Sequence, residues 1–206
     1  VEYSHNGRLH ICSAKLLVNT AGPWANRVLE KVTPNPAKLE FDLIAGTHII
    51  IDTPSPKGMY YVEAPQDGRA VFVMPWKGKT MIGTTETKFT GDPSDVVALE
   101  NEIDYLCDIA RAYFPSLAEL KRNNIYSSFS GLRVLPHATG KAFSRPRETT
   151  FHIDKKLAPR VATIYGGKLT AYRITAENFV RKMKKILPAK TRKTSTRELT
   201  LSPVKP

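Results

Sequence analysis

The sequence predicts an α+β fold in which a mixed, largely antiparallel sheet with helices is inserted between two parts of a second unit. Alternating and β-branched runs follow one another between residues 41 and 84, separated by Pro- or Gly-containing turns, as in antiparallel sheets. At residues 15–32 and 161–186, by contrast, a short β-like run leads directly into a helical pattern. We therefore expect strands and a helix at each end of the chain, with the larger sheet between them.

The composition is that of a globular protein with one large domain or two small ones. Of the 206 residues, 41% are apolar and 24% are charged, which excludes disorder throughout. Cys12 and Cys107 have no metal-ligand spacing, so we expect no disulfide framework, no Cys-based metal site and a reducing, cytoplasmic location. No apolar run approaches the roughly 18 residues of a membrane span, and the first residues do not resemble a signal peptide.

The formal net charge of +12 is concentrated near the C-terminus. Residues 181–206 contain nine Lys or Arg and one Glu, a net charge of +8. Such a tail is a solvated end, a linker, or a contact with acidic lipid or nucleic acid, so attachment to a membrane surface stays open. Because no aromatic residue follows Phe179 to stack on bases, we expect no nucleic-acid partner.

The N-terminal part begins with predicted strands at residues 8–12 and 15–19. Pro23 suits the first turn of a helix that would continue to about residue 32, and two prolines mark a linker just beyond it. Four strands forming an antiparallel meander are then expected at residues 41–52, 58–63, 70–75 and 79–84.

A loop is expected at residues 86–93, after which Ser94 is a good N-cap for a helix that runs to Phe114. The apolar face predicted for this helix consists of Val97, Leu99, Ile103, Leu106, Ile109 and Tyr113. Further strands are expected at about residues 125–135 and 149–153, separated by an irregular loop at 136–146 and followed by a turn at 155–159.

A strand at residues 161–165 meets a helix through Gly166 and Gly167. From there apolar residues recur at helical spacing, namely Leu169, Tyr172, Ala176, Phe179, Met183 and Ile186. The first turn of a helix has unpaired N–H groups and a partial positive charge, to which Lys168 adds a full charge. The pattern therefore indicates either a turn that binds an anion close to the glycine backbone or only a tight connection.

Seven short motifs, taken together and in order, resemble the FAD-dependent glycerol-3-phosphate dehydrogenase family within the larger group of D-amino-acid-oxidase-like flavoproteins. They are LVNTAGPW at 17–24, GTHI at 46–49, MPW at 74–76, IGTTE at 82–86, GDP at 91–93, FSGLR at 129–133 and YGGKLTAYR at 165–173. The resemblance extends over residues 8–187. It implies oxidation of sn-glycerol 3-phosphate to dihydroxyacetone phosphate by hydride transfer to FAD, with a quinone or oxygen as electron acceptor.

The resemblance also implies a division of the chain. Residues 1–36 and 148–187 would belong to an FAD-binding domain, residues 37–147 to a substrate-binding domain, and residues 188–206 to the basic tail. The Gly-x-Gly-x-x-Gly motif that would hold the FAD pyrophosphate is absent, because no two of the twelve glycines are two positions apart. We therefore expect a fragment that retains FAD poorly, is inactive or nearly so, and self-associates through unpaired sheet edges.

The resemblance assigns cofactor contacts to two glycine-containing turns, at Thr20, Ala21, Gly22, Gly166, Gly167, Lys168, Leu169 and Thr170. The alternative for the first turn is a simple helix entry. Lys168 and Thr170 would also border the substrate. The phosphate would be held by an Arg, whose planar guanidinium matches two phosphate oxygens. Strand register favours Arg147 for this role, and the preceding Ser favours Arg145.

His48 and Arg133 are the expected catalytic residues. A neutral imidazole at His48 could accept the proton of the C2 hydroxyl, and Arg133 matches the substrate-contacting Arg of the family. The alternatives are a satisfied core histidine and a surface ion pair. Two other functions stay open: a flavin-dependent oxidase of an amino acid or other small anion, and a non-enzymatic module that binds acidic lipid or nucleic acid through its tail.

Overall fold

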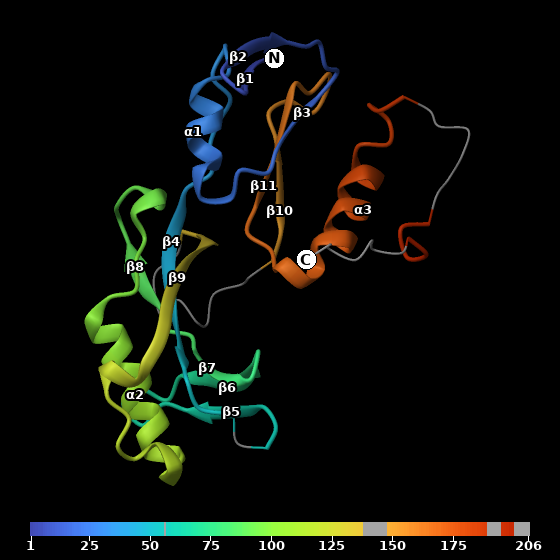
Figure 1. The fold of residues 1–206 in the computed structure, drawn as a ribbon. Coiled ribbons are helices and arrows are strands. Elements are labelled where there is room, and N and C mark those ends of the chain that lie inside the picture. Colours follow the sequence, from blue (N-terminus) through green and yellow to red (C-terminus); the bar gives the residue numbers. More distant parts are fainter. Residues whose placement is uncertain (56, 138–147, 189–194, 200–206) are drawn as a thin grey trace.

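The computed structural model describes residues 1–55, 57–137, 148–188 and 195–199. These residues form an α+β structure with a large antiparallel sheet, a smaller mixed sheet and a separate N-terminal hairpin (Figure 1). The large sheet and helix α2 occupy one end of the molecule, and the smaller sheet with helices α1 and α3 occupies the other. None of the helices in the described residues is both long and apolar enough to cross a membrane.

The large sheet is built around its longest buried strand, β4 (Phe41–Ile51). One edge of β4 pairs with β7 (Lys79–Gly83) and β8 (Thr87–Phe89), and the other pairs with β9 (Ile125–Pro136) along its length. Strands β5 (Tyr60–Glu63) and β6 (Ala70–Trp76) continue the sheet beyond β7, all antiparallel. The expected meander is therefore present in β5–β7, but β4 lies between β7 and β9 instead of beside β5.

The two faces of this sheet differ in environment because side chains alternate along each strand. One face, including Ile49, Ile51, Val73 and Ile82, packs against the apolar side of helix α2 (Glu100–Tyr113) to form the main core. The opposite face carries partly exposed aromatic side chains such as Phe72 and Phe129. The sheet thus has one covered face and one open face.

Helix α2 begins later than expected. Asp92, not Ser94, accepts the capping hydrogen bond, and it caps a short 3-10 turn, Pro93–Asp95. The α-helix starts only at Glu100, so Val97 and Leu99 lie outside it and are exposed. Tyr113 is exposed as well, which makes these three members of the predicted apolar face wrong. The predicted loop before the helix also contains β8.

The smaller sheet joins the two ends of the chain. Strand β11 (Val161–Tyr165) pairs with β10 (Thr150–Ile153) on one side and, in parallel, with β3 (Leu17–Asn19) on the other. Helix α3 (Tyr172–Lys182) packs against it through Phe179, together with Met183 just after the helix. The parallel β3–β11 pairing places the segments before and after the large sheet side by side.

The remaining N-terminal elements are shorter or more numerous than expected. Helix α1 (Ala25–Glu30) follows a 3-10 turn at Gly22–Trp24 and ends before residue 32. Strand β1 (Glu2–His5), which the sequence did not predict, pairs with β2 (Arg8–Ile11) in an exposed hairpin. Asn6 and Gly7, both with positive φ, form its turn, as the Asn-Gly pair favours.

Candidate functional site

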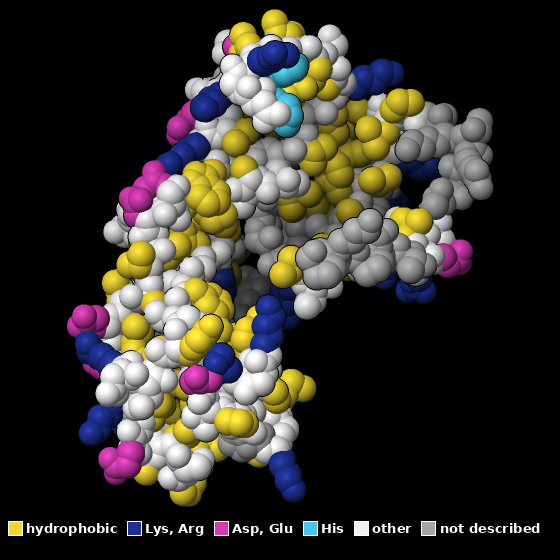
Figure 2. Space-filling model, in the orientation of Figure 1, with side chains coloured by type: hydrophobic (Ala, Val, Ile, Leu, Met, Phe, Trp, Pro, Cys, Tyr) yellow, Lys and Arg dark blue, Asp and Glu magenta, His cyan; other side chains and the backbone are white. Residues whose placement is uncertain are grey.

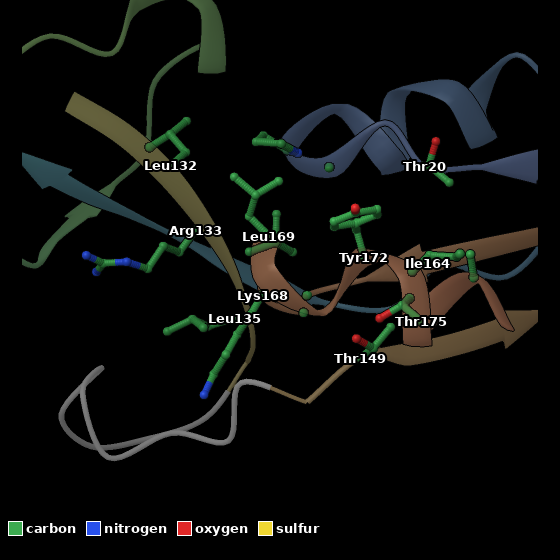
Figure 3. A pocket seen from close by; sticks show the side chains of 16 residues that line it. Thr20, Leu132, Arg133, Leu135, Thr149, Ile164, Lys168, Leu169, Tyr172 and Thr175 are labelled. Atoms are coloured by element: carbon green, nitrogen blue, oxygen red, sulfur yellow. The ribbon is translucent and has the colours of Figure 1, made fainter. Parts of the chain in front are cut away.

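A cavity of about 720 Å³ lies where the smaller sheet meets the end of β9. Three segments that are far apart in the sequence line it: the turn after β3, strand β9, and the β11–α3 connection with the first turns of α3 (Figure 3). The space-filling view shows hydrophobic side chains gathered beside the hollow between the two ends of the molecule (Figure 2). The lining residues include Thr20, Gly22, Leu132, Arg133, Gly166, Gly167, Lys168, Leu169 and Tyr172.

The Gly166-Gly167 turn needs both glycines. Their φ angles of 69° and 91° lie in the left-handed region. A Cβ on Gly166 would lie 2.9 Å from the carbonyl oxygen of Glu148, and one on Gly167 would lie 2.6 Å from Thr149 Oγ1. The turn is therefore a tight connection packed against the chain before β10, and it also lines the cavity.

The helix after this turn starts later than the apolar pattern indicates. Residues Leu169–Ala171 form a 3-10 turn, and the α-helix begins at Tyr172. Leu169 and Tyr172, the first two apolar residues of this helical spacing, are 89% and 61% exposed and are not part of a buried stripe. Both line the cavity instead, because the helix turns this side toward the space beside β9.

The predicted cofactor residues thus lie in two turns that face one cavity. Thr20 and Gly22 come from the first turn, and Gly166 to Leu169 from the second. Ala21 and Thr170 belong to the same turns but are not among the residues that line the cavity. Arg145 and Arg147 lie outside the described residues.

His48 lies on the open face of the large sheet, between Gly83 of β7 and Phe129 of β9 in the strand register. Its ring stacks on Phe129, with centroids 5.0 Å apart and planes 8° apart. A Cβ on Gly83 would lie only 2.3 Å from His48 Cδ2, so the ring occupies the space that this glycine leaves. His48 Nδ1 is buried and has no hydrogen-bond partner among the described residues. His48 is therefore not a core histidine with its hydrogen bonds satisfied.

Arg133 lies on the same open face and is held from two sides. Its Nη1 donates to Glu86 Oε1 and its Nη2 to Thr84 Oγ1, each at 3.0 Å. The Glu86 side chain is only 6% exposed and that of Arg133 24%, so the ion pair is partly buried rather than a surface pair. Figure 3 shows the Arg133 and Lys168 side chains extending away from the end of the cavity that Thr20, Ile164 and Thr175 line.

Two paired glycines separate His48 from Arg133 on this face. Along β4 and β9 the facing pairs are His48–Phe129, then Gly46–Gly131, then Ile44–Arg133. The Arg133 guanidinium crosses Gly46, where a Cβ would lie 2.5 Å from Nη2. A Cβ on Gly131 would meet no atom within 4 Å. Gly46 is thus covered by the Arg133 guanidinium and the Thr84 hydroxyl, whereas Gly131 leaves a bare patch of sheet between Phe129 and Arg133.

Several residues of this arrangement were missed at the sequence level. Glu86 and Thr84 bind Arg133, and Gly83 makes room for His48; all three belong to the IGTTE motif at residues 82–86, to which no site residue was assigned. A glycine inside a strand pattern is a signal for a close approach, and it could have indicated Gly83. No comparable local signal relates Glu86, between β7 and β8, to Arg133 on β9, 47 residues away.

Burial and a neighbouring positive charge both change the pKa of His48. Burial lowers the pKa of His48 below its ordinary value of 6.5, and the positive charge of Arg133 lowers it further. The imidazole is therefore neutral near pH 7. An imidazole with a lowered pKa can accept a proton from a bound hydroxyl only if that hydroxyl becomes more acidic in the site, for which the Arg133 charge is suited.

We expect the imidazole signals of His48 to titrate below pH 6.5 in NMR spectra of the 206-residue chain. In Arg133→Gln the midpoint should rise, because one repulsive charge is removed, but stay below 6.5, because burial remains. Since the unfolded chain binds this proton more readily, stability should increase with pH up to about 6.5. An unchanged midpoint in Arg133→Gln would show that the two side chains do not interact.

The chain matches known flavoproteins over most of its length. Residues 2–173 match the FAD dependent oxidoreductase family. The chain is 33% identical over 187 residues to D-erythritol 1-phosphate dehydrogenase of Brucella abortus, covering 90% of this chain and 37% of that protein. It is 32% identical over 181 residues to aerobic glycerol-3-phosphate dehydrogenase of Escherichia coli, covering 86% of this chain and 36% of that protein.

Solved structures agree with these matches. The glycerol-3-phosphate dehydrogenase from Bacillus halodurans complexed with FAD superposes with a TM-score of 0.71 at 32% identity, covering 86% of this chain and 33% of that one. Glycine oxidase from Geobacillus kaustophilus, at 16% identity and a TM-score of 0.54, shows the shared fold alone. The chain spans about a third of the length of the dehydrogenases it matches.

Proposed function

We propose that this chain, which belongs to the family of FAD-dependent oxidoreductases, forms the substrate-facing sheet and one wall of the flavin site in an enzyme that oxidises sn-glycerol 3-phosphate to dihydroxyacetone phosphate. The observation that carries this proposal is the placement of His48 and Arg133 on one sheet face, with bare backbone at Gly131 beside them and with Arg133 also lining the cavity that the Gly166-Gly167 turn lines. In support, relatives at 32–33% identity are dehydrogenases of glycerol 3-phosphate and D-erythritol 1-phosphate.

The division of the chain follows the same proposal. Residues 37–147 supply the substrate-binding sheet, and residues 1–36 and 148–187 supply parts of the FAD-binding domain. The parallel pairing of β3 with β11 supports this division, because it joins the two flanking segments into one sheet.

The cavity residues fit a flavin cofactor. Leu132, Leu169 and Tyr172 provide apolar walls for an aromatic ring system, and Lys168 provides a positive charge. Gly22 also lines the cavity, with a φ of 53° and no atom within 4 Å of its missing Cβ, which leaves room for a ligand close to the backbone. When bound, FAD supplies the acceptor for the hydride that leaves C2 of the substrate.

His48 and Arg133 act on the hydroxyl at C2 of the substrate. Because Nδ1 of His48 is buried, Nε2 is the nitrogen that receives the hydroxyl proton. The positive charge of Arg133 favours the alkoxide that this transfer creates, and its bonds to Glu86 and Thr84 fix the guanidinium before substrate arrives. The phosphate is held by Arg147, with Arg145 as the alternative, and by Lys168.

We expect the isolated 206-residue chain to bind FAD weakly and to reduce a dye with glycerol 3-phosphate no faster than FAD alone. The reason is that no Gly-x-Gly-x-x-Gly motif is present to hold the pyrophosphate. Flavin fluorescence titration and a dye-reduction assay measure both properties. Turnover close to that of the Bacillus halodurans enzyme would contradict the expectation.

A hybrid enzyme tests the proposed reaction itself. In this hybrid, residues 8–187 replace the matching segment of the Bacillus halodurans dehydrogenase, which leaves the rest of that enzyme unchanged. We expect the hybrid to bind FAD and to oxidise glycerol 3-phosphate. A hybrid that holds FAD with its normal absorption spectrum but oxidises no glycerol 3-phosphate would contradict the proposal.

D-erythritol 1-phosphate is the second candidate substrate. The relative that acts on it matches 90% of this chain at 33% identity, as well as the glycerol-3-phosphate enzymes do. The bare backbone at Gly131 has no atom within 4 Å of its missing Cβ, which leaves room there for the additional carbon. Comparing kcat/KM of the hybrid for the two phosphates distinguishes these candidates.

A further inference from the structure

A buried carboxylate lies behind the proposed site, on the covered face of the large sheet. Glu102, in the first turn of α2, is 3% exposed. Its Oε1 accepts hydrogen bonds from the hydroxyls of Thr85 at 2.8 Å and Thr87 at 2.7 Å. Its Oε2 accepts from the Thr47 hydroxyl at 2.6 Å and from the Leu99 N–H at 3.3 Å. The carboxylate thus connects one helix to three points of the sheet.

Two of these points are neighbours of the proposed site. Thr47 lies between Gly46 and His48 on β4. Thr85 lies between Thr84 and Glu86, both of which bind the Arg133 guanidinium. Successive side chains of extended backbone point to opposite faces, so a bond on the covered face orients the neighbours on the open face.

The segment that carries Thr84 and Glu86 is held both through its carbonyls and through Thr85. The Arg69 guanidinium donates to the carbonyls of Thr84 at 3.0 Å and Glu86 at 3.4 Å. The segment connects β7 to β8 and forms no ladder pairing of its own. It is attached to β4 by the Thr85 N–H, which donates to the Thr47 carbonyl at 3.2 Å, and by the Thr47 N–H, which donates to Thr85 Oγ1 at 2.9 Å. Glu102 binds the hydroxyls of the same two threonines and so completes this attachment.

Stability alone does not explain a carboxylate at this position. Burial raises the pKa of Glu102, but the hydrogen bonds from Thr47, Thr87, Thr85 and Leu99 together outweigh burial, so this pKa lies below its ordinary value. Within the described part of the chain no cation contributes to this effect. Apolar residues of similar volume are often as stabilising as a buried charge, whereas an ionised carboxylate fixes the orientation of several donors at once.

We propose that Glu102 is a positioning residue for Arg133: by holding Thr47 and Thr85 on the covered face, it fixes Thr84 and Glu86 where they orient the guanidinium on the open face. The effect of Glu102 on catalysis rests on the proposed function. Its effect on the geometry of Arg133 does not, and it can be measured in the 206-residue chain.

The first test uses NMR spectra of the 206-residue chain with labelled arginine. In Glu102→Gln only one side-chain oxygen remains to accept hydrogen bonds. Some of the four donors, which are the three threonine hydroxyls and the Leu99 N–H, therefore lose their partner. We expect the Arg133 guanidinium signals to move toward those of a solvated arginine. The control Ile109→Val removes buried volume from the same helix without touching the cluster and should leave them unchanged. Unchanged Arg133 signals in Glu102→Gln would overturn the proposal.

A second variant covers the case in which Glu102→Gln does not fold. Thr85→Val keeps the shape of the side chain and the carboxylate but removes the hydroxyl that joins them. It should also move the Arg133 guanidinium signals toward those of a solvated arginine. Unchanged Arg133 signals in a folded Thr85→Val chain would equally overturn the proposal.

The second test is a double-mutant cycle in the hybrid enzyme. Because a small displacement of a catalytic group can lower a rate greatly, Glu102→Gln should lower kcat/KM for glycerol 3-phosphate by roughly 100-fold. In an Arg133→Ala background the same change should cost less than about 3-fold, because the group that it positions is gone. Equal losses in both backgrounds would show that Glu102 does not act through Arg133. A hybrid that is inactive before any substitution would contradict the proposed function, while the NMR result would still decide the positioning role.

Discussion

Arg133→Ala in the hybrid enzyme is expected to lower kcat/KM for glycerol 3-phosphate by about 100- to 1000-fold, the usual loss when a group that stabilises a developing oxyanion is removed. The structure places this guanidinium on the open sheet face, where Glu86 and Thr84 hold it at 3.0 Å each. Its charge is therefore fixed in advance and does not need to be ordered by the substrate. Steady-state kinetics with a dye acceptor measure the loss.

The control for this variant separates catalysis from stability. Arg133→Ala removes the guanidinium partner of Glu86, whose side chain is only 6% exposed, and this change destabilises the fold. The double variant Arg133→Ala/Glu86→Gln removes the negative charge as well. We expect it to recover much of the thermal stability but none of the activity. Activity that returns together with stability would show that Arg133 has a structural role only.

Gly83→Ala is expected to displace the His48 ring. The new Cβ would lie 2.3 Å from Cδ2 and 2.6 Å from Cγ of the imidazole, far inside van der Waals contact. Either the ring or the strand must move, which should cost about 1–3 kcal/mol of unfolding free energy. In the hybrid enzyme, kcat/KM should fall roughly 100-fold, because a displaced base no longer meets the substrate hydroxyl.

Gly131→Ala is the matched control for this glycine. It lies on the strand at the other edge of β4, and its new Cβ would meet no atom within 4 Å. In NMR spectra of the 206-residue chain, stacking on Phe129 should shift the His48 ring protons upfield in the wild type and in Gly131→Ala. The shift should disappear in Gly83→Ala. If it persists there, the glycine does not determine the position of the ring.

The sequence was most informative where structure is set locally. The apolar and β-branched runs predicted the strands of the large sheet except β8, and the α+β class and the family resemblance are confirmed. The pattern around Gly166-Gly167 predicted the strand, the turn and the helix in the right order. Each of these features depends on residues within a few positions of one another, which is the range over which hydrophobic period and turn chemistry act.

The errors occur where a contact between residues far apart in the sequence determines the local structure. Ser94 satisfies the local rule for a helix start, but the helix begins at Glu100, and Glu102 binds Thr47 from a strand 55 residues earlier. Leu169 and Tyr172 fit a buried stripe by spacing, yet they face the cavity beside β9. In the same way, the resemblance indicated His48 and Arg133, but only the pairing of β4 with β9 shows that the Gly46–Gly131 pair lies between them.

The central claim is that the open sheet face presents a phosphorylated polyol to the flavin. Anaerobic rapid mixing of the FAD-loaded hybrid with glycerol 3-phosphate, D-erythritol 1-phosphate or glycine, followed by flavin absorbance, tests it most directly. We predict that a phosphorylated polyol bleaches the flavin, that glycine does not, and that the bleaching slows by about 100-fold or more in Arg133→Ala. Bleaching by glycine alone, or equal rates with and without Arg133, would contradict the claim.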